Sequence, residues 1–142
     1  MIAILTPIIF YRYKDLKRIL FIWAALTLLA VLKAWYQRHF GFTEAELHWL
    51  FVRGGSSTHI IHSGVRYFSF FSDAANFGSS MGLSMVVFCC SALYYKNFWT
   101  KLFFLGVGAA ACYGMIISGT RSALAVPFAG FALFILLAKQ VR

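Results

Sequence analysis

The sequence predicts an all-α, polytopic transmembrane helical bundle. Of its 142 residues, 61% are hydrophobic and only 12% are charged, whereas soluble domains average about 25% charged residues. The apolar runs approach the roughly 20 residues that a helix needs to cross a bilayer. They are continuous rather than alternating, which argues against a transmembrane β-barrel. We therefore expect one membrane domain over residues 1–142, with about three full spans and a partial N-terminal span.

The N-terminal part contains the partial span and the first full span. Residues 2–10 are apolar but too short to cross a membrane, and no basic residues precede them as in a signal peptide. We interpret them as the end of a helix, and the chain as a central fragment of a longer protein. A basic link over residues 12–18 follows, and then a full span over residues 19–36. Lys33, near the end of that span, is expected to extend toward the lipid headgroups.

Residues 37–73 have a mixed composition and are predicted to form a long external loop. Thr43 to Phe51 has the pattern of a capped amphipathic helix lying along the membrane interface, and the glycines and serines of residues 54–57 end it. The histidines of this region lack partners at metal-site spacing, so we expect solvated side chains and no metal. The histidines expected to be solvated are His48, His59 and His62, and His39 also lies in this loop.

Three apolar segments follow the loop. Residues 74–95 and 102–117 are predicted to be the second and third spans, joined by a basic link at residues 96–101. Residues 118–121 form a tight turn, after which residues 122–138 cross back. Small residues let helices approach closely in lipid, so the glycine and serine face of the second span should pack on the glycine and alanine face of the third. The cysteines lie in these spans and are read as packing residues, without a disulfide: Cys89, Cys90 and Cys112.

The positive charge indicates orientation rather than nucleic-acid binding. The net charge is +9, and much of it lies in the links at residues 12–18, 96–101 and 139–142. Counting spans places these links on one side of the membrane, and the 37–73 loop and 118–121 turn on the other. Lys and Arg gather in short cytoplasmic loops. We therefore predict a multi-pass protein of the bacterial inner membrane, with the 37–73 loop and the turn in the periplasm.

Two arginines share the predicted external side, Arg66 and Arg121. A charged side chain near a bilayer is costly unless it is paired, hydrated or interfacial, so two of them suggest a bound anion. Hydroxyl side chains surround Arg121, and the helix that follows offers unpaired N–H groups. Together these groups suit a phosphate oxygen. The hydroxyl residues are Ser118, Thr120 and Ser122.

Each arginine also has a purely structural interpretation. Arg121 could extend to lipid headgroups, and Arg66 could form a local salt bridge with Asp73. Asp73 is also a candidate N-cap for the second span, whose first turn contains Asn76.

The residues around the arginines resemble the motifs of the O-antigen ligase family. Arg66 is followed by Phe71–Asn76 at the start of a span, similar to that family's arginine-to-asparagine signature. Residues 117–124 resemble its serine–arginine turn. The chain lacks the usual proline before Asn76, and Ser122 stands where a glycine is usual. The resemblance covers residues 12–138. Members include lipopolysaccharide O-antigen ligases and polysaccharide polymerases.

The resemblance implies a glycosyltransferase of lipopolysaccharide biosynthesis that works without a metal or other cofactor. It would move a glycan from undecaprenyl diphosphate to lipid A-core, or to a growing glycan in a polymerase. Arg66 and Arg121 would bind the donor diphosphate, supported by Ser118, Thr120, Ser122 and Asn76. The family's catalytic histidine would follow Arg142, so no catalytic residue is expected in this chain. A non-enzymatic membrane transport or scaffold protein is the alternative from another class.

Overall fold

The structure, a computed structural model, describes residues 13–52, 55, 59–61 and 64–140, and it confirms the all-α fold class. The helices in this part are α2 (Tyr13–Phe40), α3 (Glu44–Val52), α5 (Ala74–Tyr94), α6 (Phe98–Ile117) and α7 (Ala125–Gln140). A 3₁₀ turn, η1 (Arg121–Leu124), precedes α7. The two-residue strands β1 (Ile60–Ile61) and β2 (Gly64–Val65) pair antiparallel.

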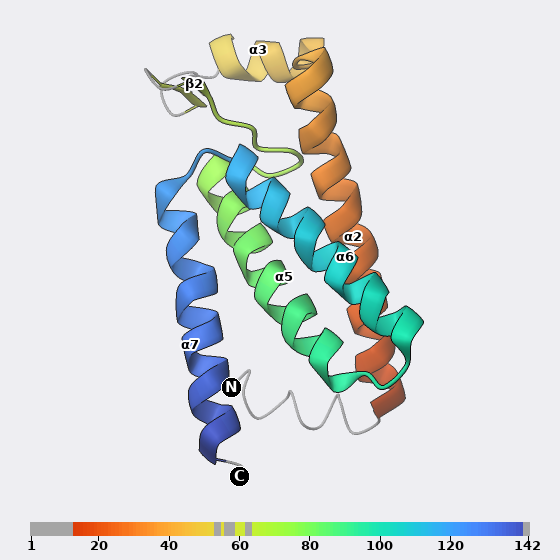
Figure 1. Cartoon of the computed structure of the whole chain (residues 1–142). Coiled ribbons are helices and arrows are strands. Elements are labelled where there is room, and N and C mark those ends of the chain that lie inside the picture. The colour runs from red at the N-terminus through yellow and green to blue at the C-terminus, as the bar shows by residue number, and fades with distance from the viewer. Residues whose placement is uncertain (1–12, 53–54, 56–58, 62–63, 141–142) are drawn as a thin grey trace.

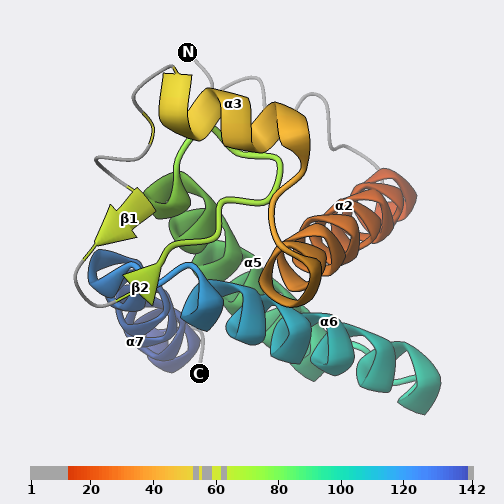
Figure 2. The ribbon, with the colours of Figure 1, turned by 90° about the horizontal axis from the view of Figure 1, so that it is seen from above.

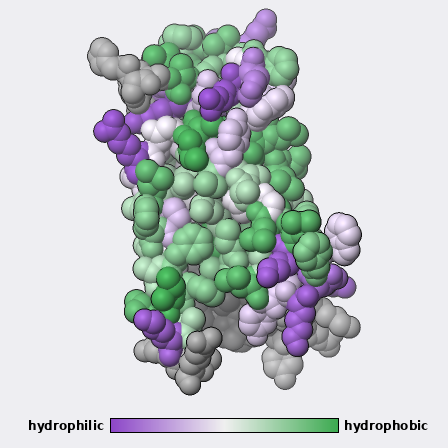
Figure 3. Space-filling view, in the orientation of Figure 1, coloured by the Kyte–Doolittle hydropathy of each residue, from purple (hydrophilic) through white to green (hydrophobic). Residues whose placement is uncertain are grey.

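Among the described residues, four helices are long and apolar enough to cross a membrane. They cover Asp15–Phe40, Ala74–Tyr94, Phe98–Ile117 and Arg121–Lys139. Three of them correspond to the three full spans expected, and the fourth is the segment after the 118–121 turn, which the sequence also predicts to cross back. The partial span predicted at residues 2–10 lies outside the described residues. In the space-filling view, a predominantly hydrophobic band separates more polar ends (Figure 3).

The four long helices run antiparallel in chain order (Figure 1). One end, which we call the loop end, carries the described residues between 41 and 73 together with residues 118–121. The opposite end, which we call the basic end, carries the start of α2, the α5–α6 link and the last turn of α7. The links that the sequence assigned to opposite sides therefore lie at opposite ends of the bundle.

Helix α5 packs on both α6 and α7, whereas α2 packs mainly on α6 (Figure 2). Small residues permit the close contacts of α5: a Cβ added to Gly108 of α6 would lie 2.9 Å from the Sγ of Cys89. Gly82 of α5 faces Met115 of α6, and also Pro127 of α7. The glycine face of α5 therefore packs on α7 as well as on the expected partner α6.

Helix α2 is longer than the expected span at both ends. The 13–18 part of the basic link is helical, and so are residues 37–40 of the expected loop. Charged side chains on a helix surface do not interrupt it, because Lys, Arg and Glu have good helix propensity. Gly41 ends the helix with a φ of 84°, and its N–H donates to the carbonyl of Gln37.

Helix α3 begins as the sequence predicts. The backbone N–H of Thr43 donates to Oε2 of Glu46 at 2.8 Å, which is the reciprocal half of a capping box. The helix lies across the loop end, beside the end of α2 (Figure 1).

Candidate functional site at the loop end

Arg66 lies directly on the turn that joins α6 to η1. Its Cγ is 3.3 Å from the point that a Cβ on Gly119 would occupy. Its backbone N–H donates to the carbonyl of His59 at 2.8 Å, which places it immediately after the β1–β2 pair. The Nε of Arg66 is enclosed and has no hydrogen-bond partner among the described residues. A segment 53 positions earlier in the chain therefore reaches the turn that carries Arg121.

The turn itself is built from buried hydroxyls. Ser118 Oγ donates to the carbonyl of Met115 at 2.7 Å and accepts the N–H of Thr120 at 3.3 Å. Both side chains are buried. A Cβ on Gly78 of α5 would collide with Ser118 Oγ, so the glycine lets the turn sit against α5. Ser118 and Thr120 shape the turn through hydrogen bonds to its backbone, and their support of a phosphate stays a prediction.

Arg121 and Ser122 are exposed at the start of η1. The N–H of Ala123 donates to the carbonyl of Thr120 at 3.2 Å, closing this single 3₁₀ turn before α7 begins at Ala125. Asn76 is exposed in the first turn of α5, at the same end of the bundle. The structure thus brings all the predicted site residues to the loop end, and it packs Arg66 against the turn.

Asp73 occupies the N-cap position of α5, but its side chain makes no cap hydrogen bond there. Its Oδ1 lies 3.7 Å from Nε2 of His59. The ion pairs found within 4.0 Å among the described residues do not include Arg66 with Asp73, so that interpretation of Arg66 is wrong. The β1–β2 pair brings His59, rather than the guanidinium, to the carboxylate.

His59 is buried, with 1% of its surface exposed. Its Nδ1 lies 2.9 Å from the carbonyl oxygen of Gly55, and its ring meets Trp49 and Phe68 edge-on. The prediction of a solvated side chain is wrong for His59 and right for His48, which is exposed on α3. His62 lies outside the described residues. No local sequence signal marks this burial, since Ile60, directly after His59, is itself exposed.

A polar cluster that the sequence did not predict holds the loop end together. We call it the latch, and its members are Lys33, Gln37, Glu46 and Ser69. Lys33 Nζ and Gln37 Nε2 each lie 2.9 Å from Oε1 of Glu46. The side-chain amide of Gln37 also bonds both backbone groups of Ser69. Lys33 therefore pairs with α3 instead of extending to the headgroups.

The latch also lowers the pKa of Glu46. Burial alone would raise this pKa, but the N–H of Thr43, Lys33 and Gln37 together favour the charged carboxylate and bring it below its ordinary value. A charge this well paired stabilises the folded loop end. It fixes α3 and the 66–73 segment to the end of α2.

Arg66 and Arg121 lack an acidic partner of the kind that Lys33 has in Glu46. Neither of the two forms an ion pair within 4.0 Å in the part of the chain that the structure describes. In that part, no group of three or more His, Cys, Asp or Glu side chains could hold a metal ion. Guanidinium groups are of the kind that bind anions through charge-assisted hydrogen bonds, and anion binding by Arg66 and Arg121 stays a prediction.

No protein-family model, curated protein or solved structure matches this chain.

Proposed function

We propose that this chain forms the donor-binding part of a membrane glycosyltransferase of the O-antigen ligase kind. It would move a glycan from an undecaprenyl-diphosphate carrier to lipid A-core. The observation that carries the proposal is the packing of Arg66 against the turn that holds Arg121. The resemblance of both segments to the motifs of that family supports it.

Glycan transfer from a diphosphate carrier is favoured by positive charge beside the diphosphate leaving group. The acceptor hydroxyl attacks the anomeric carbon, the bond from that carbon to the phosphate oxygen breaks, and the diphosphate leaves with the electron pair. The hydroxyl proton passes to a general base, to which we assign no residue of this chain. Guanidinium groups stabilise the charge that develops on the diphosphate oxygens. The enclosed Nε–H of Arg66 suits this role, because a buried donor is costly without an acceptor.

The charge distribution supports a periplasmic loop end. Among the described residues, the basic end has six Lys or Arg and one acidic residue, whereas the loop end has four and three. Lys and Arg are enriched on the cytoplasmic side of membrane proteins. This orientation would put both arginines outside the inner membrane, where a lipid-linked glycan would meet its acceptor. The basic residues of the basic end are Lys14, Lys17, Arg18, Lys96, Lys101 and Lys139.

The test is transfer of a labelled glycan by the purified full-length protein, with lipid A-core as acceptor. Arg66→Ala and Arg121→Ala should each lower the rate by about 100-fold to 1,000-fold, the usual cost of removing one group that faces developing charge. Arg→Lys should restore only part of it, since an ammonium lacks the planar fork. Arg38→Ala is the matched control, because Arg38 is an exposed arginine at the same end.

Full transfer by the Arg66→Ala, Arg121→Ala double variant would refute the proposal. Transfer to a growing glycan, but not to lipid A-core, would assign the protein as a polymerase with the same donor site. Absence of transfer to either acceptor by the unaltered protein would favour a transport or scaffold role.

A further inference from the structure

Ser69 has an unusual backbone conformation in the segment between β2 and α5. Among the described residues other than glycine, it alone has a positive φ, 54°. L-residues with a side chain seldom adopt this left-handed conformation, because the Cβ comes too close to the following carbonyl oxygen. Ser69 is also buried, with 3% of its surface exposed. A conformation of this kind persists only where the surrounding contacts impose it, and such residues cluster at functional sites.

Three hydrogen bonds to α2 impose the conformation of Ser69. Its Oγ donates to the carbonyl of Ala30 at 2.6 Å, and its backbone N–H donates to Oε1 of Gln37 at 3.0 Å. Nε2 of Gln37 donates in turn to the carbonyl of Ser69 at 3.3 Å. The N–H of Phe71 donates to the carbonyl of Phe68 at 2.9 Å, which closes a tight turn around Ser69. Every polar group of Ser69 therefore attaches this turn to α2.

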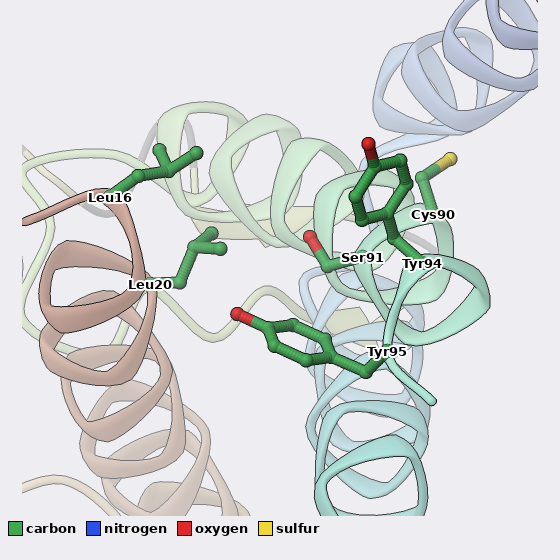
Figure 4. A pocket seen from close by; sticks show the side chains of 6 residues that line it. All are labelled: Leu16, Leu20, Cys90, Ser91, Tyr94 and Tyr95. Carbon is green, nitrogen blue, oxygen red and sulfur yellow. The ribbon is translucent and has the colours of Figure 1, made fainter. Parts of the chain in front are cut away.

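The turn bridges α2 and α5 at the loop end. In Figure 1 the chain that leaves β2 crosses to α2 before it returns to the start of α5. At the basic end the same two helices stand apart, and a groove of about 380 Å³ separates the leucines of α2 from Ser91 and Tyr95 (Figure 4). Between these ends, Trp23 Nε1 donates to Ser84 Oγ at 3.1 Å. Because α2 and α5 do not pack along their whole length, the attachment at Ser69 is one of the few contacts that join them.

Ser69 also limits where Arg66 can lie. Three residues span at most about 11 Å, so the backbone of Arg66 stays within that distance of the turn. On its other side, the N–H of Arg66 donates to the carbonyl of His59 at 2.8 Å. Between the two points, Phe68 is buried and its ring meets that of His59 edge-on. The chain is thus held both before and after Arg66, at the place where its Cγ lies against Gly119.

We propose that Ser69 is a positioning residue for Arg66, an inference that rests on the proposed function. It holds the turn on α2 through its hydroxyl and its left-handed backbone, and so keeps the guanidinium beside the 118–121 turn. Ser69 itself contacts neither the donor nor the acceptor in this role. A misplacement of about 1 Å in a group that acts on the reacting bond can lower the rate about 100-fold. A residue three positions away can therefore control the reaction through Arg66.

The first test is a double-mutant cycle on glycan transfer by the purified full-length protein. Ser69→Ala should lower kcat by up to about 100-fold, but it should cause no further loss when Arg66 is already alanine. A purely structural role would lower the rate by the same factor in both backgrounds, because independent effects add. Ser84→Ala is the matched control, since Ser84 is also buried and hydrogen-bonded to α2 but lies away from the loop end. Its effect on kcat should be the same in the two backgrounds.

The second test separates the conformation of Ser69 from its hydroxyl and does not need transfer. Hydrogen exchange of the amides of residues 66–71 should be about threefold to tenfold faster in Ser69→Ala, because one hydrogen bond is lost. Ser69→Gly should exchange more slowly than Ser69→Ala, because glycine adopts a positive φ without steric cost. Ser84→Ala should leave the exchange of these amides unchanged.

Three results would each overturn the proposal: an equal loss of kcat from Ser69→Ala in the two backgrounds, unchanged exchange in Ser69→Ala, or equal exchange in the alanine and glycine variants. Absence of transfer by the unaltered protein would instead refute the proposed function. In that case the exchange rates still decide whether Ser69 holds the segment that carries Arg66.

Discussion

The latch makes a quantitative prediction about α3. Glu46→Ala removes the carboxylate that accepts from Lys33, Gln37 and the N–H of Thr43. The ammonium of Lys33 is then left without its partner in a site where its side chain is only 21% exposed. Breaking a fully buried pair costs about 3–5 kcal/mol. Because both side chains here retain some exposure, we expect about 2 kcal/mol.

Hydrogen exchange measured by mass spectrometry is the assay, because the loss should be local. A cost of about 2 kcal/mol corresponds to an exchange rate about 30-fold higher for the amides of α3, if they exchange by local opening. Amides in the middle of α5 and α6 should keep their protection. Glu44→Ala is the control, since Glu44 lies on the same helix and is exposed. Unchanged protection of α3 in Glu46→Ala would show that the latch does not hold this helix.

The same pair predicts a dependence on pH. The pKa of Glu46 is lowered in the folded protein from an ordinary value of 4.5. A depressed carboxyl pKa contributes stability above the unfolded value, and this contribution is lost as the pH falls through the folded value. Protection of α3 should therefore decline below about pH 4.5 in the unaltered protein. Glu46→Gln should remove this decline, and a decline of equal size in that variant would refute the assignment to Glu46.

Two further predictions concern packing. Gly82→Leu should destabilise the bundle by about 1–3 kcal/mol, because a Cβ at this position already lies 3.2–3.3 Å from Ala123, Pro127 and Met115. Gly106→Leu should have little effect, because nothing lies within 4 Å of its Cβ position. Equal unfolding of the Gly82→Leu and Gly106→Leu variants in detergent would contradict the close packing of α5 at Gly82. His59→Ala should cost about 2–4 kcal/mol by leaving a cavity between Trp49 and Phe68. Faster hydrogen exchange of the amides of residues 64–73 would report that loss. His48→Ala is the control, because His48 is exposed. Equal exchange rates in the two variants would contradict the packing role of His59.

The sequence predicted the features that depend on local composition. Long apolar runs located the spanning helices, and the order of the spans assigned Arg66 and Arg121 to one end. The Thr43–Glu46 cap was also predictable, because both of its partners lie within one turn. The boundaries of α2 were not predicted, because the charged residues next to the apolar span were taken as the ends of the helix. Only Gly41, with its positive φ, ends it.

The features that depend on distant segments could not be predicted. Burial of His59 needs the β1–β2 pair and the rings of Trp49 and Phe68 around it. Pairing of Lys33 with Glu46 needs α3 to lie back across the end of α2, which no local pattern specifies. Sequence reasoning placed Arg66 and Gly119 at one end of the bundle. Their contact is set by the path of the chain after β2.

The length of α2 makes the latch sensitive to the thickness of the bilayer. Its 28 residues correspond to about 42 Å at 1.5 Å per residue, against a hydrocarbon core of about 30 Å. Lys33 is seven residues before the end of α2, which puts it about 10 Å below that end. In a thin bilayer the ion pair between Lys33 and Glu46 would lie among hydrated headgroups. A thicker bilayer would draw it toward the hydrocarbon, where an ion pair is harder to open and a lone ammonium more costly. The lipid around the protein therefore sets how firmly α3 is held.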